Sequence, residues 1–200
     1  MLLKDTPRRV IRELSLVAAE VNGVELDAAY DDDVFKADIV VKEGDSIDLG
    51  GLTVEAVETP GHTRDSLSFY VPELELLILN ETLGVLMPDG SIYPCFLTSY
   101  ADTISSIVKC RRIPHKYLSL PHKGIVGGED ANGFFDRAFA VNTACRDFIV
   151  GMNDGNLSEE EMLDLFYQKY SSDMLLAYQP KEAFMANARA TISCTLRDEK

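Results

Sequence analysis

Apolar residues follow a helical spacing at the start of the chain, which predicts a helix over residues 6–23. Its apolar face consists of Val10, Leu14, Val17 and Val21. Thr6 is a suitable N-cap, Pro7 fits the first helical position, and Gly23 can close the end. A capped, amphipathic helix is therefore expected near the start of the sequence.

Between residues 37 and 79 the spacing changes to the alternation typical of strands. Turn residues separate four such runs: ADIVV (37–41), SIDLGGLTVEAVE (46–58), SLSFYV (66–71) and ELLILN (75–80). Gly50 and Gly51 lie between two strand-like segments of the second run, which predicts a tight hairpin. This part of the chain is expected to be mainly sheet.

From about residue 97 onward the apolar spacing is again mainly helical. The predicted helices are TSYADTISSIVKC (98–110), ANGFFDRAFAVNTACRDFIV (131–150), SEEEMLDLF (158–166) and residues 181–196. A short strand, YLSL (117–120), interrupts them. Ser158 is a good N-cap, and acidic residues fill the first turn that follows it.

Composition and charge narrow the range of partners. The 200 residues suffice for one large domain, and their formal net charge of −14 argues against nucleic acid, which needs a basic surface. No apolar stretch is long enough to span a bilayer, and the charged residues near the start argue against a secretory signal. The four cysteines form no Cys-x-x-Cys pair. We therefore expect a cytoplasmic protein with reduced thiols, a small-molecule substrate, and no nucleic-acid or membrane partner.

His62 stands where one strand-like run stops and the next has not begun, in the segment Thr59-Pro60-Gly61-His62-Thr63. Proline ends a ladder and glycine permits a sharp turn, so the imidazole is held at the end of a sheet. Metal ligands and catalytic groups often occupy such loops, because a rigid strand positions them. A histidine that only caps a turn is the other interpretation, and spacing alone leaves both open.

Several motifs in order resemble the metallo-β-lactamase superfamily of metal-dependent hydrolases. The segment EGDSIDLGGLTVEAVETPGHTRDSLSFYVPELELLILNETLGV (43–85) is similar to that family's Gly-Asp turn, hairpin, Thr-Pro-Gly-His-Thr ligand loop, aliphatic strand and Gly-Asp-Thr-Leu motif. LSLPHKG (118–124), followed by GGEDA (127–131) and a helix, resembles the final strand and Pro-Gly-His-Gly ligand loop. The similarity runs from about residue 37 to residue 136, and its motifs together are far more specific than any single one.

The resemblance implies three metal ligands in this chain. His62 matches the histidine of the first ligand loop, and His122 matches the histidine of the last one. Glu81 stands where the family usually has an aspartate that bridges two metals, although the extra methylene of glutamate moves the carboxylate. A simple turn carboxylate is the other interpretation of Glu81. Because each of the three follows a strand, we expect them to converge at one end of the sheet.

The family's His-x-His-x-Asp-His motif, which is expected upstream of His62, is missing. No histidine precedes His62, the run Asp31-Asp32-Asp33 is expected to be a solvated turn, and His115 an ordinary surface residue. The chain thus resembles a family member that begins after the first half of its sandwich. A truncated chain, a natural split protein and a decayed, non-catalytic relative remain alternative explanations.

The resemblance also leads us to expect metal-dependent hydrolase activity. The family implies a metal-activated water that attacks an ester, thioester, amide or phosphoester. His62, Glu81 and His122 form a two-histidine, one-carboxylate set that suits zinc, with iron or manganese as other options. The missing motif carries most of the family's first ligands, so we expect weak metal binding. It also carries the aspartate that orients the water, so we expect little hydrolysis by this chain alone. A non-catalytic binding or interaction module is the alternative.

The resemblance also implies the fold and its partners. We expect an α/β fold that is the C-terminal portion of the family's αβ/βα sandwich, with a mainly helical C-terminal section. Residues 1–150 would form an N-terminally incomplete metallo-β-lactamase-like domain, and 151–200 a helical extension packed on it. A half sandwich leaves a sheet face or edge uncovered, which implies a homodimer or a complementing N-terminal half.

Overall fold

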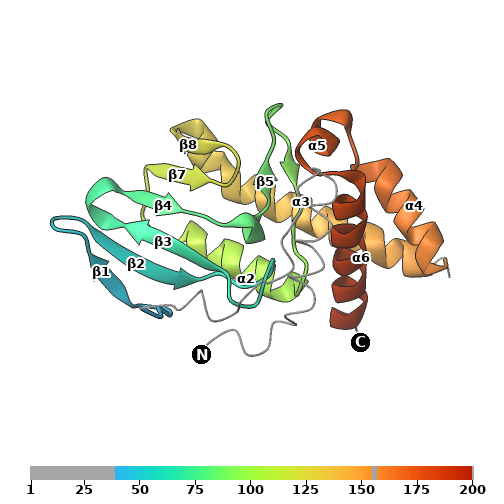
Figure 1. The fold of residues 1–200 in the computed structure, drawn as a ribbon, viewed down its shortest axis with the longest axis horizontal. Coiled ribbons are helices and arrows are strands. Elements are labelled where there is room, and N and C mark those ends of the chain that lie inside the picture. Colours follow the sequence, from blue (N-terminus) through green and yellow to red (C-terminus); the bar gives the residue numbers. More distant parts are fainter. Residues whose placement is uncertain (1–38, 155–156, 200) are drawn as a thin grey trace, which may run out of the picture.

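The computed structural model describes residues 39–154 and 157–199. The helix predicted over 6–23 and the acidic run 31–33 lie outside these described residues. Within them the fold is α/β, as expected, and combines one main sheet with a helical C-terminal section (Figure 1). No helix of this described part has both the length and the apolar character needed to cross a membrane.

The main sheet has six strands in the order β1-β2-β3-β4-β7-β8. The strands are β1 Ser46–Asp48, β2 Thr53–Glu58, β3 Leu67–Val71, β4 Leu76–Ile78, β7 Tyr117–Leu120 and β8 Gly124–Gly127. All neighbours are antiparallel except β4 and β7, which are parallel. Strands β2, β4 and β7 therefore run in the same direction, and their carboxyl ends meet at one edge of the sheet. A separate ribbon pairs β5 Val85–Leu86 with β6 Ile92–Tyr93.

Two helices cover one face of the sheet, α2 (Tyr100–Arg111) and α3 (Glu129–Asp154). Leu77 of β4 and Leu118 of β7 are paired across the ladder, are fully buried, and belong to one apolar core with residues of both helices. The alternation in these strands is thus explained, because every second side chain faces the helices. This core fixes the strand ends that carry the candidate ligands.

The C-terminal section contains α4 (Glu159–Tyr170), α5 (Asp173–Tyr178) and α6 (Lys181–Asp198), at the right of Figure 1. Ser158 caps α4 in a complete capping box with Glu161, as the sequence predicts. These helices share a second core with the C-terminal half of α3, while the N-terminal half of α3 belongs to the sheet core. The predicted boundary after residue 150 falls inside α3, and the two-part division of the chain stays a prediction.

One strand prediction is wrong over the described residues. Residues 39–41 of the run ADIVV form no strand, and the side chains of Ile39 and Val40 are 71% and 56% exposed. The ladder begins only at β1, after a turn in which the backbone N–H of Asp45 donates to the carbonyl of Lys42. β-branched residues form a strand only where a neighbour completes the ladder, and none does so here among the described residues.

The predicted Gly50-Gly51 hairpin is confirmed. Both glycines have positive φ, 81° and 110°, as a turn that matches the twist of the strands requires. The strands β5, β6 and β8 and the helix α5 were not predicted from the sequence. They are two to six residues long, too short to show a periodic pattern.

Candidate metal centre

The structure brings His62, Glu81 and His122 together at the common carboxyl edge of β2, β4 and β7. Nε2 of His62 lies 3.0 Å from Oε2 of Glu81, and Nε2 of His122 lies 2.6 Å from Oε1 of the same carboxylate. The carboxylate therefore stands between two imidazoles, one at each oxygen. The side chains are 20%, 32% and 54% exposed in that order, so the cluster is open to solvent on the His122 side.

Gly61 is the residue that allows the His62 loop to lie where it does. Its φ is +142°, and a Cβ built there would lie 2.0 Å from Oγ1 of Thr103 in α2. The Gly61 carbonyl also accepts hydrogen bonds from the backbone N–H groups of Leu97, at 3.0 Å, and Thr98, at 2.9 Å. Only glycine combines this conformation with such close approach of the chain to a helix.

A buried polar network joins the loop after β2 to the loop after β4. The Thr82 hydroxyl donates to the Thr59 carbonyl at 2.8 Å and accepts the backbone N–H of His62 at 3.1 Å. The Asn80 amide donates to the Thr59 hydroxyl, which in turn pairs with Ser68 at 3.0 Å. Thr59, Ser68 and Thr82 are fully buried. Because this network is satisfied inside the protein, it fixes His62 relative to the strand that precedes Glu81.

Glu81 occupies the first position of a single 3-10 turn, Glu81–Leu83. The side chain of Asn80 caps this turn by accepting the backbone N–H of Thr82 at 2.8 Å. Glu81 is therefore a turn carboxylate, as one interpretation of the sequence had it, and it also reaches both imidazoles. Its metal role stays a prediction.

His122 projects from the tight turn between β7 and β8. Its φ is 60°, and the backbone N–H of Lys123 donates to the carbonyl of Leu120 at 3.3 Å. Pro121 before a left-handed residue is the arrangement of a type II turn, in which that place is normally taken by glycine or asparagine. A histidine there accepts backbone strain, which structures retain most often at functional positions.

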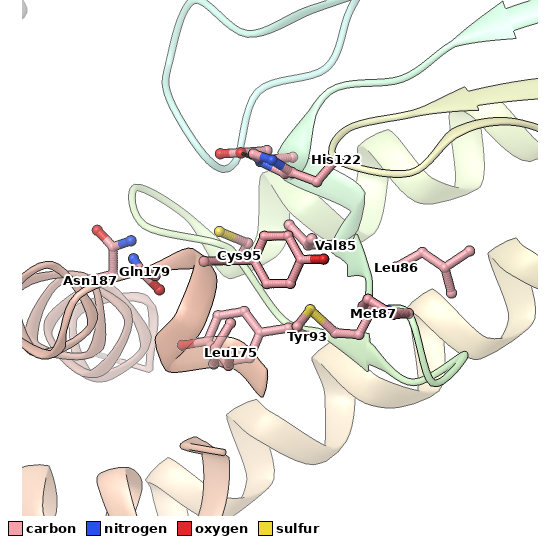
Figure 2. Close-up of a pocket in the computed structure, with 12 residues that line it drawn as sticks. Val85, Leu86, Met87, Tyr93, Cys95, His122, Leu175, Gln179 and Asn187 are labelled. Carbon is pink, nitrogen blue, oxygen red and sulfur yellow. Dashed lines mark hydrogen bonds and ion pairs between the residues drawn. The ribbon is translucent and has the colours of Figure 1, made fainter. Parts of the chain in front are cut away.

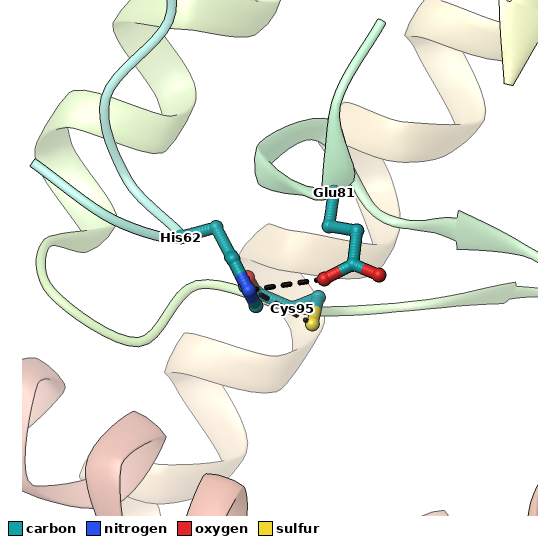
Figure 3. Close-up of side chains that lie close together, drawn as sticks. All are labelled: His62, Glu81 and Cys95. Carbon is teal, nitrogen blue, oxygen red and sulfur yellow. Dashed lines mark hydrogen bonds and ion pairs between the residues drawn. The ribbon is translucent and has the colours of Figure 1, made fainter. Parts of the chain in front are cut away.

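Cys95 is the residue at the cluster that the sequence analysis missed (Figure 3). Its carbonyl oxygen lies 2.9 Å from Nδ1 of His62, and its buried Sγ lies 3.3 Å from the same nitrogen. A carbonyl oxygen can only accept, so Nδ1 carries the hydrogen and Nε2 is directed at Glu81. The contact links residues 33 positions apart, and Cys95 follows a strand of only two residues, so no sequence pattern indicated it.

The third histidine is not part of the cluster. His115 precedes β7, whereas His122 follows it, so they lie at opposite ends of that strand. The ring of His115 is half-buried, packs edge-on against Phe135 at 5.3 Å, and lies 2.7 Å through Nδ1 from the carbonyl of Ile113. It is therefore more enclosed than the expected surface residue, because α3 packs over it.

The sequence model of the metallo-beta-lactamase superfamily matches residues 5–122. The chain belongs to this superfamily. Among curated proteins, hydroxyacylglutathione hydrolase from Rhodopseudomonas palustris strain HaA2 is 35% identical over 81 residues, which is 40% of this chain and 30% of that protein. The enzyme of the same name from Idiomarina loihiensis is 34% identical over 74 residues, 37% of this chain and 27% of its own length. The chain thus spans less than half the length of the curated relatives it matches.

Solved structures support the same fold. An archaeal metallo-beta-lactamase superfamily protein from Sulfolobus tokodaii has a TM-score of 0.55 at 17% identity, over 91% of this chain and 64% of its own. A metallo-beta-lactamase family protein from Thermus thermophilus has a TM-score of 0.52 at 15% identity, over 94% of this chain and 60% of its own. At this identity the likeness concerns the fold alone.

The donor set of this superfamily member fits a divalent metal ion. Zinc binds imidazole nitrogen and carboxylate oxygen at about 2.1 Å, and at the tetrahedral angle two such atoms on one ion lie about 3.4 Å apart. Nε2 of His62 and Oε2 of Glu81 are 3.0 Å apart, so a small separation of the two side chains would admit the ion. The closer ring of His122 needs a small outward movement, which its exposure permits. The Sγ of Cys95 is a further donor, since ligand atoms of His62, Glu81 and Cys95 all lie within 4.8 Å of one another.

The pKa values of His62 and Glu81 in the metal-free cluster also indicate a place for a positive charge. Burial alone would lower the pKa of His62, but hydrogen bonds with Cys95 and Glu81 outweigh it and raise this pKa well above its usual range. The hydrogen bond from His62, with a smaller contribution from His122, holds the pKa of Glu81 below its usual range despite burial. The space between imidazole and carboxylate therefore favours a cation, either a proton or a metal ion.

Proposed function

We propose that this protein is a metal-dependent hydrolase and that His62, Glu81 and His122 bind its metal ion. The observation that carries the proposal is the Glu81 carboxylate between two imidazoles at the common edge of three strands. Zinc suits this donor set best, and iron or manganese are the alternatives. The Nδ1 contact of His62 with the Cys95 carbonyl supports it, because ligating histidines are normally oriented by such a second hydrogen bond.

In this proposal the chain's own residues hold and orient the reacting groups. His62 presents Nε2 in a fixed direction, Glu81 supplies negative charge beside it, and His122 supplies a third donor on the solvent-exposed side of the cluster. When bound, the ion would lower the pKa of a coordinated water and polarise the scissile carbonyl. Glu81 and His122 also line a cavity, so a substrate can reach the cluster from that side.

We propose an ester or thioester as the scissile bond. The curated relatives are named for the hydrolysis of hydroxyacylglutathione, in which an acyl group is attached to glutathione. The local identity covers 40% of this chain, so it supports acyl transfer to water as the class of reaction. This local identity does not support glutathione as part of the substrate of this chain.

We further propose that the chain alone binds metal weakly and hydrolyses slowly. Of its three histidines two lie in the cluster, and the superfamily's His-x-His-x-Asp-His motif is not in its sequence. The motif would carry most of the first ligands of the superfamily site and the carboxylate that orients the water. The three donors of this chain are only the number that a single catalytic zinc ion needs. A second polypeptide that carries the motif would supply the further ligands and the orienting carboxylate.

The experiment is a zinc titration against a competing chelator dye, with cobalt absorption as a second readout. We expect one ion per chain, and at least a tenfold loss of affinity in His62→Ala, Glu81→Ala and His122→Ala. His115→Ala is the matched control, because it removes the third histidine from the opposite end of β7, and its affinity should equal that of the native chain. Equal affinity in all five proteins would overturn the proposal.

Hydrolysis is then measured with aryl esters and thioesters in the presence of zinc. Slow turnover that rises when a chain carrying the His-x-His-x-Asp-His half is added would support the split-site form of the proposal. Metal binding without turnover, with or without that half, would favour the non-catalytic binding module. Rapid turnover by the chain alone, lost in His62→Ala, would show that the four donors suffice.

A further inference from the structure

A cavity of about 230 Å³ opens beside the metal cluster and separates the β5–β6 ribbon from α5 and α6 (Figure 2). Glu81 and His122 line its cluster end. In Figure 2, Leu86 and Met87 lie on one side, and Gln179 and Asn187 on the other. The C-terminal helical section thus forms part of the wall next to the reacting groups.

Charge is confined to the cluster end of this wall, where Glu81 and His122 lie. No lysine or arginine is among the described residues that line the cavity. Away from the cluster the wall is mainly apolar and includes Val85, Met87 and Leu175. A carboxylate or phosphate bound at that far end would lose its hydration without gaining a cationic partner, which is costly. The far end of the cavity therefore selects against anionic groups.

Two carboxamides lie in the wall contributed by the C-terminal section, beside Leu175 and the phenol of Tyr178. Gln179 follows α5 and Asn187 lies in α6, and both are half-buried. Neither side-chain amide has a hydrogen-bond partner within residues 39–154 and 157–199. Each carboxamide offers both a donor and an acceptor. Together they match a ligand group that also has one N–H and one C=O, which is an amide.

We propose that this cavity binds an uncharged, amide-bearing arm of the substrate, and that Gln179 and Asn187 recognise the amide. The inference rests on the proposed function only in placing the scissile carbonyl at the Glu81 and His122 end. The volume is below the roughly 300–1,000 Å³ of pockets for larger ligands, so the arm is short. The substrate class is then a small acyl ester or thioester whose acyl or leaving group carries a neutral amide.

Binding of three stable thioethers tests this without turnover. S-Propyl-N-acetylcysteamine carries the amide, 2-(propylthio)ethyl acetate replaces only its N–H by an ester oxygen, and 4-(propylthio)butanoate is an anion of similar length. Dissociation constants are measured by NMR titration of the metal-free chain. We expect the amide to bind about 3- to 10-fold more tightly than the ester, as one net hydrogen bond allows, and the anion to bind most weakly.

Variants separate this proposal from the metal site. Combined Gln179→Ala and Asn187→Ala should remove the preference for amide over ester, whereas Gln168→Ala, an exposed amide on α4, should leave it unchanged. Asn187→Lys should make the anion the tightest of the three ligands. The amide preference should survive in His62→Ala, so its loss would not follow from failure of the metal site. Equal affinities for all three ligands, absence of saturable binding, or a preference that survives the double substitution would overturn the inference.

Discussion

The ligand edge, formed by the loops after β2, β4 and β7, and the helical section α4–α6 are stabilised in different ways. Three fully buried polar side chains, Thr59, Ser68 and Thr82, and a glycine with positive φ hold the ligand edge in place. Apolar and aromatic side chains fill the helical section, where Phe166 and Phe184 are fully buried. Buried hydrogen bonds are directional, whereas apolar contact is not. Changes at the ligand edge should therefore alter the geometry of the cluster as well as stability, whereas changes in the core of the helical section should alter stability alone.

The largest effect is expected from Gly61→Ala. The new Cβ would meet Thr103 Oγ1 at 2.0 Å and the Thr82 methyl at 2.7 Å, in a conformation that alanine rarely adopts. Strain and overlap together should cost about 5 kcal/mol or more of unfolding free energy. Urea denaturation followed by circular dichroism measures it.

Gly133→Ala is the control for Gly61→Ala. Gly133 lies inside α3, and its Cβ would meet nothing within 4 Å. Alanine favours a helix over glycine, so stability should rise by up to about 1 kcal/mol. If Gly61→Ala lowers the free energy of unfolding no more than Gly133→Ala does, the role given to the conformation of the His62 loop is refuted.

Phe184→Ala tests the helical section. The ring is fully buried and its centroid lies 5.5 Å from that of Tyr167 and 6.2 Å from that of Phe166. Its removal leaves a cavity, and we expect a loss of about 3–4 kcal/mol. Phe139→Ala, at a 42% exposed position on α3, should cost far less. Zinc affinity of the folded Phe184→Ala protein should stay native, and a loss as large as that of His62→Ala would contradict the separation of the two regions.

The same substitution can be made in both regions. Thr82→Val removes a hydroxyl that joins His62 and Thr59, and leaves a buried N–H and C=O unpaired. We expect a loss of about 1–3 kcal/mol and weaker zinc binding. In Thr195→Val the lost hydroxyl only donates to the Thr191 carbonyl one turn earlier in α6, so the change should cost well under about 1 kcal/mol. If thermal denaturation shows the same loss of stability in Thr82→Val and Thr195→Val, the burial of the hydroxyl, and not its place in the polar network, determines the loss.

The sequence reveals these two regions to different degrees. Helices α2, α3, α4 and α6 were predicted because caps and helical spacing are local signals, and Ser158 is the clearest case. The order of motifs placed His62, Glu81 and His122 on three strand ends, and parallel directions of those strands brought them together. Cys95 could not be predicted, because it approaches His62 only through the fold.

The polar network was also beyond the sequence. Thr59, Ser68 and Thr82 would suit an exposed surface equally well, and only the fold buries them. The run ADIVV shows the opposite error, since its composition favours a strand but no neighbour completes the ladder among the described residues. Contacts between distant segments, not local propensity, decide both cases.

The smallest effect is expected at the N-terminus of α4, where local chemistry is sufficient. The Ser158 hydroxyl accepts the backbone N–H of Glu161, whose carboxylate accepts the backbone N–H of Ser158. Ser158→Ala should cost about 1 kcal/mol, and zinc affinity should not change.

Hydrogen bonds from Ser158 lower the pKa of Glu161. A lowered folded-state pKa stabilises the protein above the unfolded pKa of glutamate and ceases to do so as pH falls below the lowered value. The stability difference between the native chain and Glu161→Gln should therefore be full at neutral pH and shrink below about pH 4. Glu160→Gln, in the same turn but without a bond to Ser158 in the described structure, should lack that decline, and thermal melts across this pH range compare the two.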